Sequence, residues 1–413
     1  MGEGSSPDGP PGPLAGVRVI DAASVYAGPL IGTLMGDFGA DVVKVESPAG
    51  DALRAWGWRK DDESLWWSLI GRHKRSVTLL LSDPRGAEAL RRLVRTADVL
   101  VESFRPGTLE RWGLGPETLL EINPRLVVVR VSGFGQTGPY RERPGFGTLA
   151  ESMSGFAATN GEADGPPQLP QWPLADGVAG LVGAFAATMA LRHAERTGQG
   201  QVVDLSIYEP LLWILGAQLT AYDQLGKVPE RQGNATDFNV PRGCYRTADG
   251  GWVALSGATL PAARRILTAV GRRDLCEEPW FGSIDGRLAH RDELDAAIGA
   301  FAASRDREAV LALFAEAGAT AAPVYDVADI AGDPHFLARG TVTRAEHPDW
   351  GPVLMQGLIA RMSATPGRVT GTGPRLGEHT AEILGELGFS REALREMIRD
   401  GVVAPARDEP GAP

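Results

Sequence analysis

The stretch that decides the fold is QLPQWPLADGVAGLVGAFAATMALRHAERTGQGQVVDLSI, residues 168–207. Pro170 and Pro173 fix φ and disfavour helix in the residues before them, so the stretch should begin as an extended segment. The proline-free run over 178–196 predicts an apolar helix, and Gly198 supplies the left-handed residue that ends it. Alternating apolar residues after that glycine predict a strand. The expected order is therefore extended segment, helix and strand.

Asp176 lies in the sharp turn that we expect at residues 175–177, at the mouth of the helix. Aspartate often caps a helix start, and capping together with the helix dipole contributes about 1 kcal/mol. Gly177, Gly180 and Gly183 leave the helix without side chains at three positions near this carboxylate, which would let a ligand approach closely. Spacing alone leaves both a capping role and a chemical role open.

Length and composition limit the kind of protein this can be. A chain of 413 residues exceeds the usual single core, which predicts two domains. The net charge of −11 argues against a nucleic-acid partner, because the phosphate backbone would be repelled. We expect no apolar run of the length of a membrane span, and no secretory leader is recognised, so the expected location is cytoplasmic. The two cysteines, Cys244 and Cys276, offer neither a disulfide framework nor a thiolate metal site.

Strands and helices alternate through the first half of the chain. Short apolar strands are expected at 17–21, 41–46, 76–81, 99–102 and 126–131, with helices between them. Strands this uniformly apolar are covered on both faces, as in a doubly wound parallel α/β sheet. Ligands of such sheets bind outside the carboxyl ends of the strands.

The pattern changes near residue 226, where a polar segment with glycine and proline begins. We expect a large Rossmann-like domain over 14–226 and a smaller α+β domain over 227–330. A return segment over 331–403 follows, and a leader at 1–13 and a tail at 404–413 are expected to be disordered. Helices are expected over 211–225, 261–270, 291–304, 307–316 and 378–398, and a hairpin over 243–255.

Several common chemistries lack their motifs. The three glycines after the first strand fall at i, i+4 and i+8 and form no dinucleotide fingerprint, which removes the main support for a dehydrogenase. The six histidines show no paired metal spacing, and neither a P-loop nor a nucleophile elbow is found. Arg105 and Arg111 flank a turn after one strand, with Arg72, Lys74 and Arg75 before another, and such groups suit a phosphorylated ligand. Solvated loop charges would explain them equally well.

Together, several segments resemble the class III CoA-transferases, the family that includes formyl-CoA:oxalate and carnitine CoA-transferases. The segments are PLAGVRVIDAASVYAGPLIGTLMGDFGADVVKVESPAGD (13–51), HKRSVTLLL (73–81), DVLVESFRPGTLERWGL (98–114), GFGQTGPY (133–140), PLADGVAG (173–180), RTGQGQVVDLSIYE (196–209) and GEHT (377–380). The resemblance implies a Rossmann-like large domain that the C-terminal segment completes, a small α+β domain and an interlocked homodimer. It also implies an acyl-CoA donor and a carboxylic acid acceptor, with coenzyme A as substrate and no permanently bound cofactor or metal.

The same resemblance assigns roles to single residues. Asp176 matches the nucleophilic aspartate of the family, which implies covalent catalysis through an aspartyl anhydride and an aspartyl-CoA thioester. The positions that match or neighbour the family's CoA contacts are Tyr26, Ala27, Leu79, Ser103, Phe104, Arg105, Arg111 and Phe146. The family has basic residues where this chain has Ser47 and Ser82, and an asparagine at Ser103. Arg54, Arg72 or Arg75 are therefore considered as substitutes toward the CoA phosphates.

Two other readings stay open beside the transferase. Acyl-CoA racemases share the fold, but their proton-carrying histidine corresponds to Phe146, which cannot carry a proton. A non-catalytic CoA-ester binding protein is the alternative from another class, and Asp176 argues against it. The acyl group itself is open, because large side chains near Asp176 would suit an apolar pocket and equally suit core packing: Phe146, Met153, Phe156 and Trp172.

Overall fold

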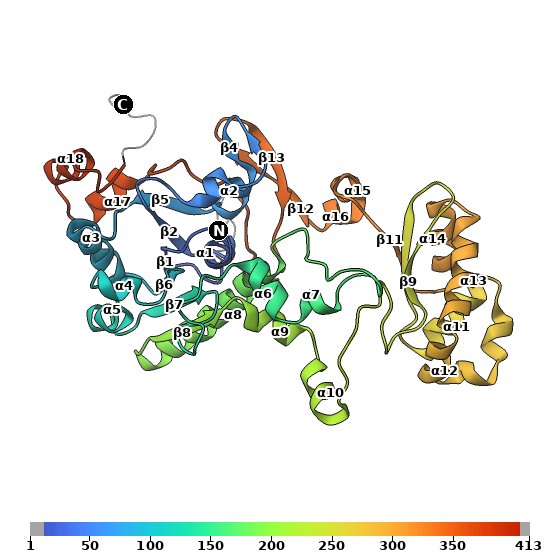
Figure 1. The fold of residues 1–413 in the computed structure, drawn as a ribbon. Coiled ribbons are helices and arrows are strands. Elements are labelled where there is room, and N and C mark those ends of the chain that lie inside the picture. The colour runs from blue at the N-terminus through green and yellow to red at the C-terminus, as the bar shows by residue number, and fades with distance from the viewer. Residues whose placement is uncertain (1–11, 405–413) are drawn as a thin grey trace, which may run out of the picture. The chain divides into compact units, whose positions relative to one another are not determined.

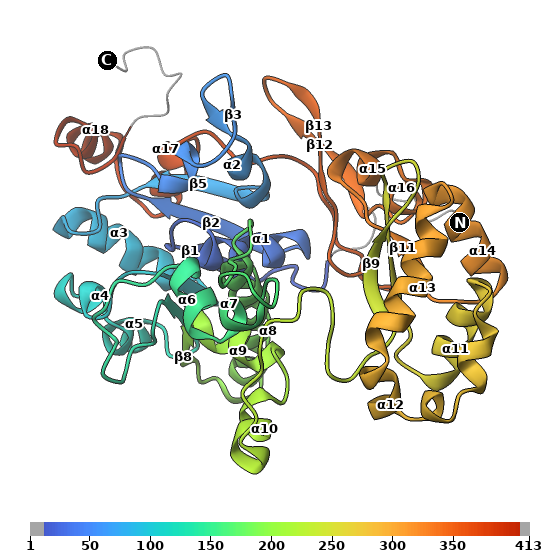
Figure 2. The same ribbon diagram turned by 45° about the vertical axis from the view of Figure 1, so that its right-hand side comes forward.

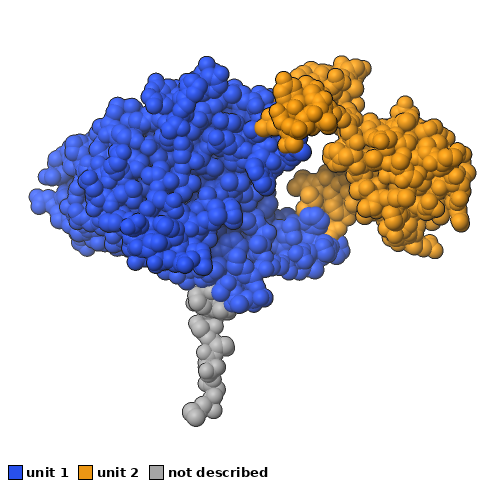
Figure 3. Space-filling view, turned by 90° about the horizontal axis from the view of Figure 1, so that it is seen from below, with its two compact units in different colours: residues 1–156, 169–218, 334–413 blue, residues 157–168, 219–333 orange. Residues whose placement is uncertain are grey.

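The computed structural model describes residues 12–404, and the chain divides into two compact units (Figure 3). The expected leader and tail, 1–13 and 404–413, lie almost entirely outside the described residues. The first unit comprises Met1–Phe156, Leu169–Gln218 and Pro334–Pro413, and the second comprises Ala157–Gln168 and Leu219–Asp333.

A six-stranded parallel sheet forms the centre of the first unit (Figure 1). Its order is β5-β2-β1-β6-β7-β8, with β1 Arg18–Asp21, β2 Asp41–Glu46, β5 Lys74–Thr78, β6 Val99–Glu102, β7 Val127–Ser132 and β8 Gln201–Ser206. The strand order reverses between β1 and β6, which is the point where doubly wound sheets bind ligands. The parallel α/β fold expected from the sequence is confirmed. β5 ends earlier than expected because Leu80 leaves the sheet and donates its N–H to the Val402 carbonyl.

Successive side chains of each strand pack into two separate hydrophobic cores, one on each face of the sheet. Val19 and Val99 join the core under α1 (Ala27–Asp37) and α8 (Leu174–Thr197). Ile20 and Leu100 join the opposite core, under α3 (Pro84–Val94), α5 (Pro116–Ile122), α17 (Thr380–Glu386) and α18 (Arg391–Arg399). In Figure 1 and Figure 2 alike, α17 and α18 lie beside α3 and β5, so the end of the chain completes this unit.

Helix α8 begins earlier than the sequence suggested. Pro173 is its N-cap, and residues 175–177, expected as a sharp turn, form its first turn. A proline is acceptable there because the first N–H groups of a helix have no intrahelical partner. The Ala175 N–H finds one outside the helix, the Oε1 of Glu151 at 3.2 Å. Asp176 therefore does not cap the helix, and the capping role is wrong.

Glycines let α8 pack closely on α1. A Cβ added at Gly180 would lie 2.6 to 2.9 Å from three side-chain atoms of Leu30, and one at Gly183 would lie 2.4 Å from Ile31. α8 is also long and apolar enough to cross a membrane by length and composition, which corrects the expectation that no run reaches that length. The same composition is typical of core helices, and 39% of its apolar window is buried.

Two expected helices are each broken in two. The helix expected over 211–225 is α9 (Tyr208–Ile214) and α10 (Gln218–Leu225), because Gly216 between them has a φ of 78°. The helix expected over 378–398 is α17 and α18, separated at Gly388 with a φ of 80°. The remaining elements of the first unit are η1 (Ala52–Ala55), β3 (Arg59–Lys60), β4 (Glu63–Ser64), α2 (Leu65–Ile70), α4 (Thr108–Arg111), α6 (Gly147–Met153), α16 (Pro334–Ala338), β12 (Val342–His347) and β13 (Gly351–Gln356); α7 (Phe156–Thr159) begins there and ends in the second unit.

The second unit is an α+β structure with its own core. The antiparallel sheet β11-β10-β9 contains the expected hairpin, β9 (Arg242–Arg246) and β10 (Trp252–Ser256), together with β11 (Ala321–Pro323). Its helices are α10, which enters this unit at Leu219, α11 (Leu260–Ala269), η2 (Arg273–Glu277), η3 (Pro279–Gly282), α12 (Ile284–Ala289), α13 (Arg291–Ala303), α14 (Arg307–Glu316) and α15 (Val327–Gly332). Phe281 and Phe314 are buried at the centre of this core.

The α1–α8 contact predicts an unusual response to alanine. Gly180→Ala should lower the free energy of unfolding by about 1–3 kcal/mol, because the new methyl group overpacks against Leu30. Gly385→Ala in α17 is the matched control, since nothing lies near its Cβ, and it should raise stability by about 0.5–1 kcal/mol through helix propensity. Urea unfolding of both variants measures the difference. Equal effects of the two substitutions would contradict the close contact.

Candidate active site

A cavity of about 560 Å³ opens at the carboxyl ends of β1, β6, β7 and β8. Asp176 lies in its wall, in the first turn of α8. Tyr26, Ala27, Ser103 and Phe146 line the same cavity, so the structure brings these sequence-predicted residues together with Asp176. The cavity lies where the strand order reverses, as expected for a doubly wound sheet.

The carboxyl of Asp176 is partly buried beside a second carboxyl. Burial, and then the negative charge of Glu151, raise the pKa of Asp176 to about 6. Glu151 is 3% exposed and belongs to α6, where its Oε1 accepts the Ala175 N–H. Since Glu151 satisfies this helix N–H, the Asp176 carboxyl is not drawn into capping and stays available to the cavity.

Glycine is required at the start of α6, where the backbone approaches Asp176 closely. A Cβ at Gly147, the first residue of α6, would lie 2.0 Å from Asp176 Oδ2. A Cβ at Gly177 would lie 3.8 Å from a ring carbon of Tyr26, which is ordinary contact. Burial, and then the charge of Asp176, raise the pKa of the Tyr26 phenol, so this side chain faces the carboxyl as a neutral hydroxyl. The site thus holds a carboxyl with a raised pKa, a neutral phenol and a closely packed backbone.

An aromatic cluster forms one side of the cavity. Tyr26 packs edge-on against Trp66 with ring centroids 5.4 Å apart, and Trp66 lies 5.3 Å from Trp56 and 6.1 Å from Trp172. Trp58 packs edge-on against Trp172 at 5.5 Å. Trp56 and Trp172 line the cavity themselves. None of the described residues that line the cavity carries a positive charge.

Sequence reasoning missed Glu151, Gly147 and Trp56. Their link to Asp176 depends on the tertiary fold, because Glu151 and Trp56 lie on other elements and Gly147 is defined by its contact with the carboxyl. The tryptophan-rich run over 56–67 was the only available signal for the aromatic wall. Of the expected acyl-pocket residues, Phe146 and Trp172 line the cavity, whereas Met153 and Phe156 do not.

The other sequence-predicted CoA contacts lie outside the cavity lining. Leu79 is buried in the core beneath α3 and α17. Phe104 packs edge-on against Trp112 at 5.2 Å, and Arg111 donates to the hydroxyl of Thr108 at 2.9 Å. Arg105 is exposed and forms no ion pair with any residue that the structure describes. Both arginines are exposed, Arg105 in the turn that follows β6 and Arg111 at the end of α4.

Three arginines considered as substitutes toward phosphate are already engaged. Arg72 is 4% exposed and pairs with Asp37 at 2.6 Å. Arg54 pairs with Glu46 at 2.7 Å, and Arg75 pairs with Asp41 at 3.2 Å and with two carboxylates of α17. The suggestion that these guanidinium groups are free for a ligand is wrong, because each completes an ion pair within the unit.

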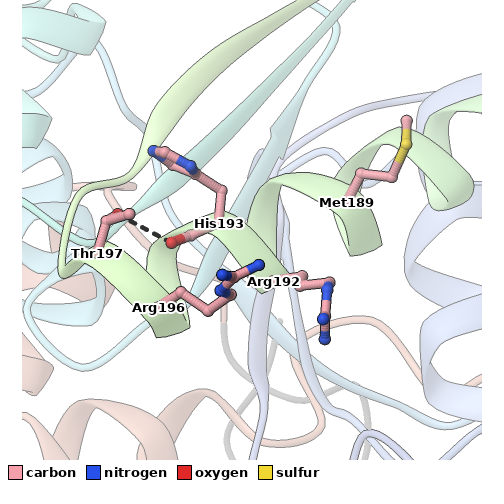
Figure 4. A pocket seen from close by; sticks show the side chains of 5 residues that line it. All are labelled: Met189, Arg192, His193, Arg196 and Thr197. Carbon is pink, nitrogen blue, oxygen red and sulfur yellow. Dashed lines mark hydrogen bonds between the residues drawn. The ribbon is translucent and has the colours of Figure 1, made fainter.

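A second groove, of about 480 Å³, lies on the last turns of α8 (Figure 4). It is lined by Met189, Arg192, His193, Arg196 and Thr197, all from one helix. The Thr197 hydroxyl donates to the His193 carbonyl at 2.8 Å, which is a local helix contact. This groove begins about 20 Å along α8 from Asp176, so it is not part of the same site. Among residues 12–404, no group of acidic, histidine and cysteine side chains is arranged to hold a metal ion.

The raised pKa of Asp176 predicts a pH-dependent stability. The folded state holds this proton more tightly than the unfolded chain, so stability is lost as pH rises from about 4 to about 6. Asp176→Asn has no such titration and should be more stable than the wild type at pH 8, on the order of 2 kcal/mol, with the difference vanishing near pH 4. Thermal unfolding over this pH range is the measurement.

Two variants serve as controls for this effect. Glu151→Gln keeps an oxygen for the Ala175 N–H but removes the neighbouring charge, so its stability loss should end at a lower pH than in the wild type. Asp164→Asn, at an exposed site of the second unit, should show no pH-dependent difference. A pH-independent effect of Asp176→Asn would contradict the burial of this carboxyl.

Comparison with known proteins agrees with the fold. The model of CoA-transferase family III matches residues 14–380. A succinyl-CoA–D-citramalate CoA-transferase of Chloroflexus aurantiacus is 41% identical over 95% of this chain and 99% of its own length. The beta subunit of a succinyl-CoA–L-malate CoA-transferase from that organism is 44% identical over 95% and 98%. The crystal structure of a CAIB/BAIF family protein from Brucella suis is 34% identical, covers 92% of this chain and all of its own, and superposes with a TM-score of 0.81. The chain therefore belongs to CoA-transferase family III and is a transferase that acts on CoA thioesters.

Proposed function

We propose that this protein moves CoA from an acyl-CoA thioester to a free carboxylic acid, with Asp176 as the nucleophile. The observation that carries the proposal is a partly buried carboxylate with a raised pKa in the wall of the cavity at the strand ends. Family membership supplies the reaction class, and the position of Asp176 supplies the nucleophile. A proton-shuttling racemase is less well supported, because no histidine is among the described residues that line the cavity.

The reaction proceeds by four exchanges at acyl carbons. An Asp176 oxygen attacks the donor thioester, the C–S bond breaks, and an anhydride and CoA thiolate form. The thiolate then attacks the aspartyl carbonyl and releases the donor acid, which leaves CoA bound to Asp176 as a thioester. The acceptor carboxylate attacks this thioester and releases the thiolate again. The thiolate finally attacks the acceptor carbonyl, which frees the new acyl-CoA and regenerates Asp176.

The surroundings of Asp176 suit these steps. Above pH 6 the carboxyl is ionised, yet its raised pKa makes it more basic and more nucleophilic than an ordinary aspartate. The tight approach of Gly147 leaves no room for a side chain at this oxygen, and partial burial limits water, which would hydrolyse an anhydride.

The relatives suggest where to look for the donor. Both Chloroflexus proteins are named for succinyl-CoA, so we propose a short dicarboxylic acyl-CoA as the first donor to test. The aromatic side formed by Trp56 and Trp172 supports aromatic or branched acyl groups as the competing class. Arg105 and Arg111, exposed after β6, are proposed to meet the CoA phosphates. In this proposal the large unit binds CoA. We propose a cytoplasmic location for the protein.

The covalent step can be detected directly. After incubation with succinyl-CoA and other acyl-CoAs, borohydride should reduce the aspartyl-CoA thioester and convert the Asp176 side chain to an alcohol. Peptide mass spectrometry should find this change in the wild type and not in Asp176→Asn, whose CoA transfer should also fall at least a thousandfold, as expected for loss of a nucleophile. Transfer without any modification of Asp176 would overturn its role, and the donor that labels best identifies the acyl class.

We also propose that the protein is a homodimer. The outer face of α8 carries Leu181, Phe185 and Met189 at i, i+4 and i+8, and these side chains are 46%, 63% and 52% exposed. A continuous apolar stripe on a helix is typical of a surface that another chain covers. Light scattering should give twice the mass of the chain, and Phe185→Arg should shift the protein toward monomer. Leu313→Arg on the second unit is the control, and a monomeric wild type would contradict the proposal.

A further inference from the structure

Four buried charges lie next to the loop that follows β1. Lys44 Nζ is 2.9 Å from Asp51 Oδ2 and 3.6 Å from Asp21 Oδ1, and Lys74 Nζ is 2.8 Å from Asp21 Oδ2. Each of these side chains is at most 1% exposed. Two carboxylates and two ammonium groups balance one another, which is the condition under which charges tolerate burial. None of the four lines the cavity.

The same groups hold the backbone of the loop. Asp51 Oδ1 accepts the Val25 N–H at 3.0 Å and the Leu53 N–H at 2.9 Å. Asp21 Oδ1 accepts the Ala23 N–H at 3.1 Å, and Lys44 donates to the Ala23 carbonyl. The pair of Lys44 and Asp51 thus grips the loop on both sides of residue 24. The Leu53 contact starts η1, which leads to Trp56 in the cavity wall.

The loop needs these hydrogen bonds because its backbone is strained. Val25 has a φ of 68°, in the left-handed region that a β-branched residue rarely adopts. Strained residues of this kind persist only when their surroundings fix them. The two residues that follow Val25 are Tyr26 and Ala27, which line the cavity together with Asp176. A relaxed Val25 would turn both of them away from their present positions.

We infer that Asp51, through its ion pair with Lys44, is a positioning residue that keeps Val25 strained and so holds Tyr26 and Ala27 opposite Asp176. This inference rests on the proposed function, since it assigns the network to the same site. Asp51 and Lys44 act through the loop and touch no substrate.

Asp51→Asn tests the inference because an amide has only one oxygen. If this oxygen faces the Val25 and Leu53 N–H groups, the amide NH₂ faces Lys44, and the reverse orientation sets the NH₂ against the two N–H groups. We expect kcat for CoA transfer to fall at least tenfold. Asp37→Asn is the matched control, because Asp37 is also buried and ion-paired, with Arg72, but lies at the last residue of α1. Its kcat should stay within about twofold of the wild type, whatever its stability.

Relief of the strain should rescue the variant. In a Val25→Gly background the left-handed φ costs nothing, so adding Asp51→Asn should reduce kcat by much less than tenfold. A purely structural role of Asp51 would give the same loss in both backgrounds, and that result would overturn the inference. If Asp51→Asn alone does not fold, Asp51→Glu replaces it, since one extra methylene moves the carboxylate off the Val25 N–H while keeping the charge.

Amide hydrogen exchange separates this inference from the proposed function. Exchange at Ala23 and Val25 should accelerate in Asp51→Asn and stay at the wild-type rate in Asp37→Asn, and this readout needs no catalysis. If the wild type transfers no CoA from any donor, the proposed function fails, while exchange still reports on the grip. If transfer occurs but exchange in the loop does not respond to Asp51→Asn, the positioning role fails alone.

Discussion

The contact between α1 and α8 sets the geometry on which the site depends. α1 begins at the loop after β1 and Asp176 lies in the first turn of α8, so the distance between the two helices fixes how far Tyr26 lies from the carboxyl. Packed helices are usually 8–10 Å apart, with the side chains at the contact deciding the distance. Gly180 and Gly183 leave Leu30 and Ile31 room to fill the space that a side chain of α8 would otherwise take. Cavity walls contributed by different parts of the chain are therefore held together by an apolar contact behind them.

Charge is distributed around the site in two ways. Behind the loop, acids and bases are paired, as in Asp51 with Lys44 and Glu46 with Arg54, and each pair fixes a strand end or a turn. In the cavity itself, Asp176 and Glu151 are acids with no cation among the described lining residues. The ion pairs behind the loop offset the free-energy cost of burying charge. In the cavity this cost is not offset, and it appears as the raised pKa of Asp176. A carboxylate that the fold does not neutralise is one whose free energy a substrate can lower.

The sequence predicted the parts of the fold that depend on local pattern. Apolar runs of four to six residues placed the strands because buried parallel strands must be apolar on both faces, and β2, β6 and α14 have the expected bounds. The start of α8 was wrong because a distant residue, Glu151, satisfies its first-turn N–H, which local pattern does not reveal. The hairpin of β12 and β13 was not predicted for a similar reason. Its His347 is 3.1 Å from Glu63, nearly three hundred residues earlier in the chain.

The site residues likewise include some that the sequence predicted and some that only the tertiary fold reveals. The position of Asp176 came from a motif and its neighbours Tyr26, Ala27, Ser103 and Phe146 from the same resemblance, and all five line one cavity. Which cations remain free could not be read from sequence, because an arginine's partner is chosen by the fold. Arg54, Arg72 and Arg75 form ion pairs with carboxylates of neighbouring elements. A carboxylate that is buried needs such a partner. Arg105, in the turn after β6, and Arg111, the last residue of α4, are instead exposed to solvent. The fold thus separates cations that are paired within the unit from cations that stay exposed.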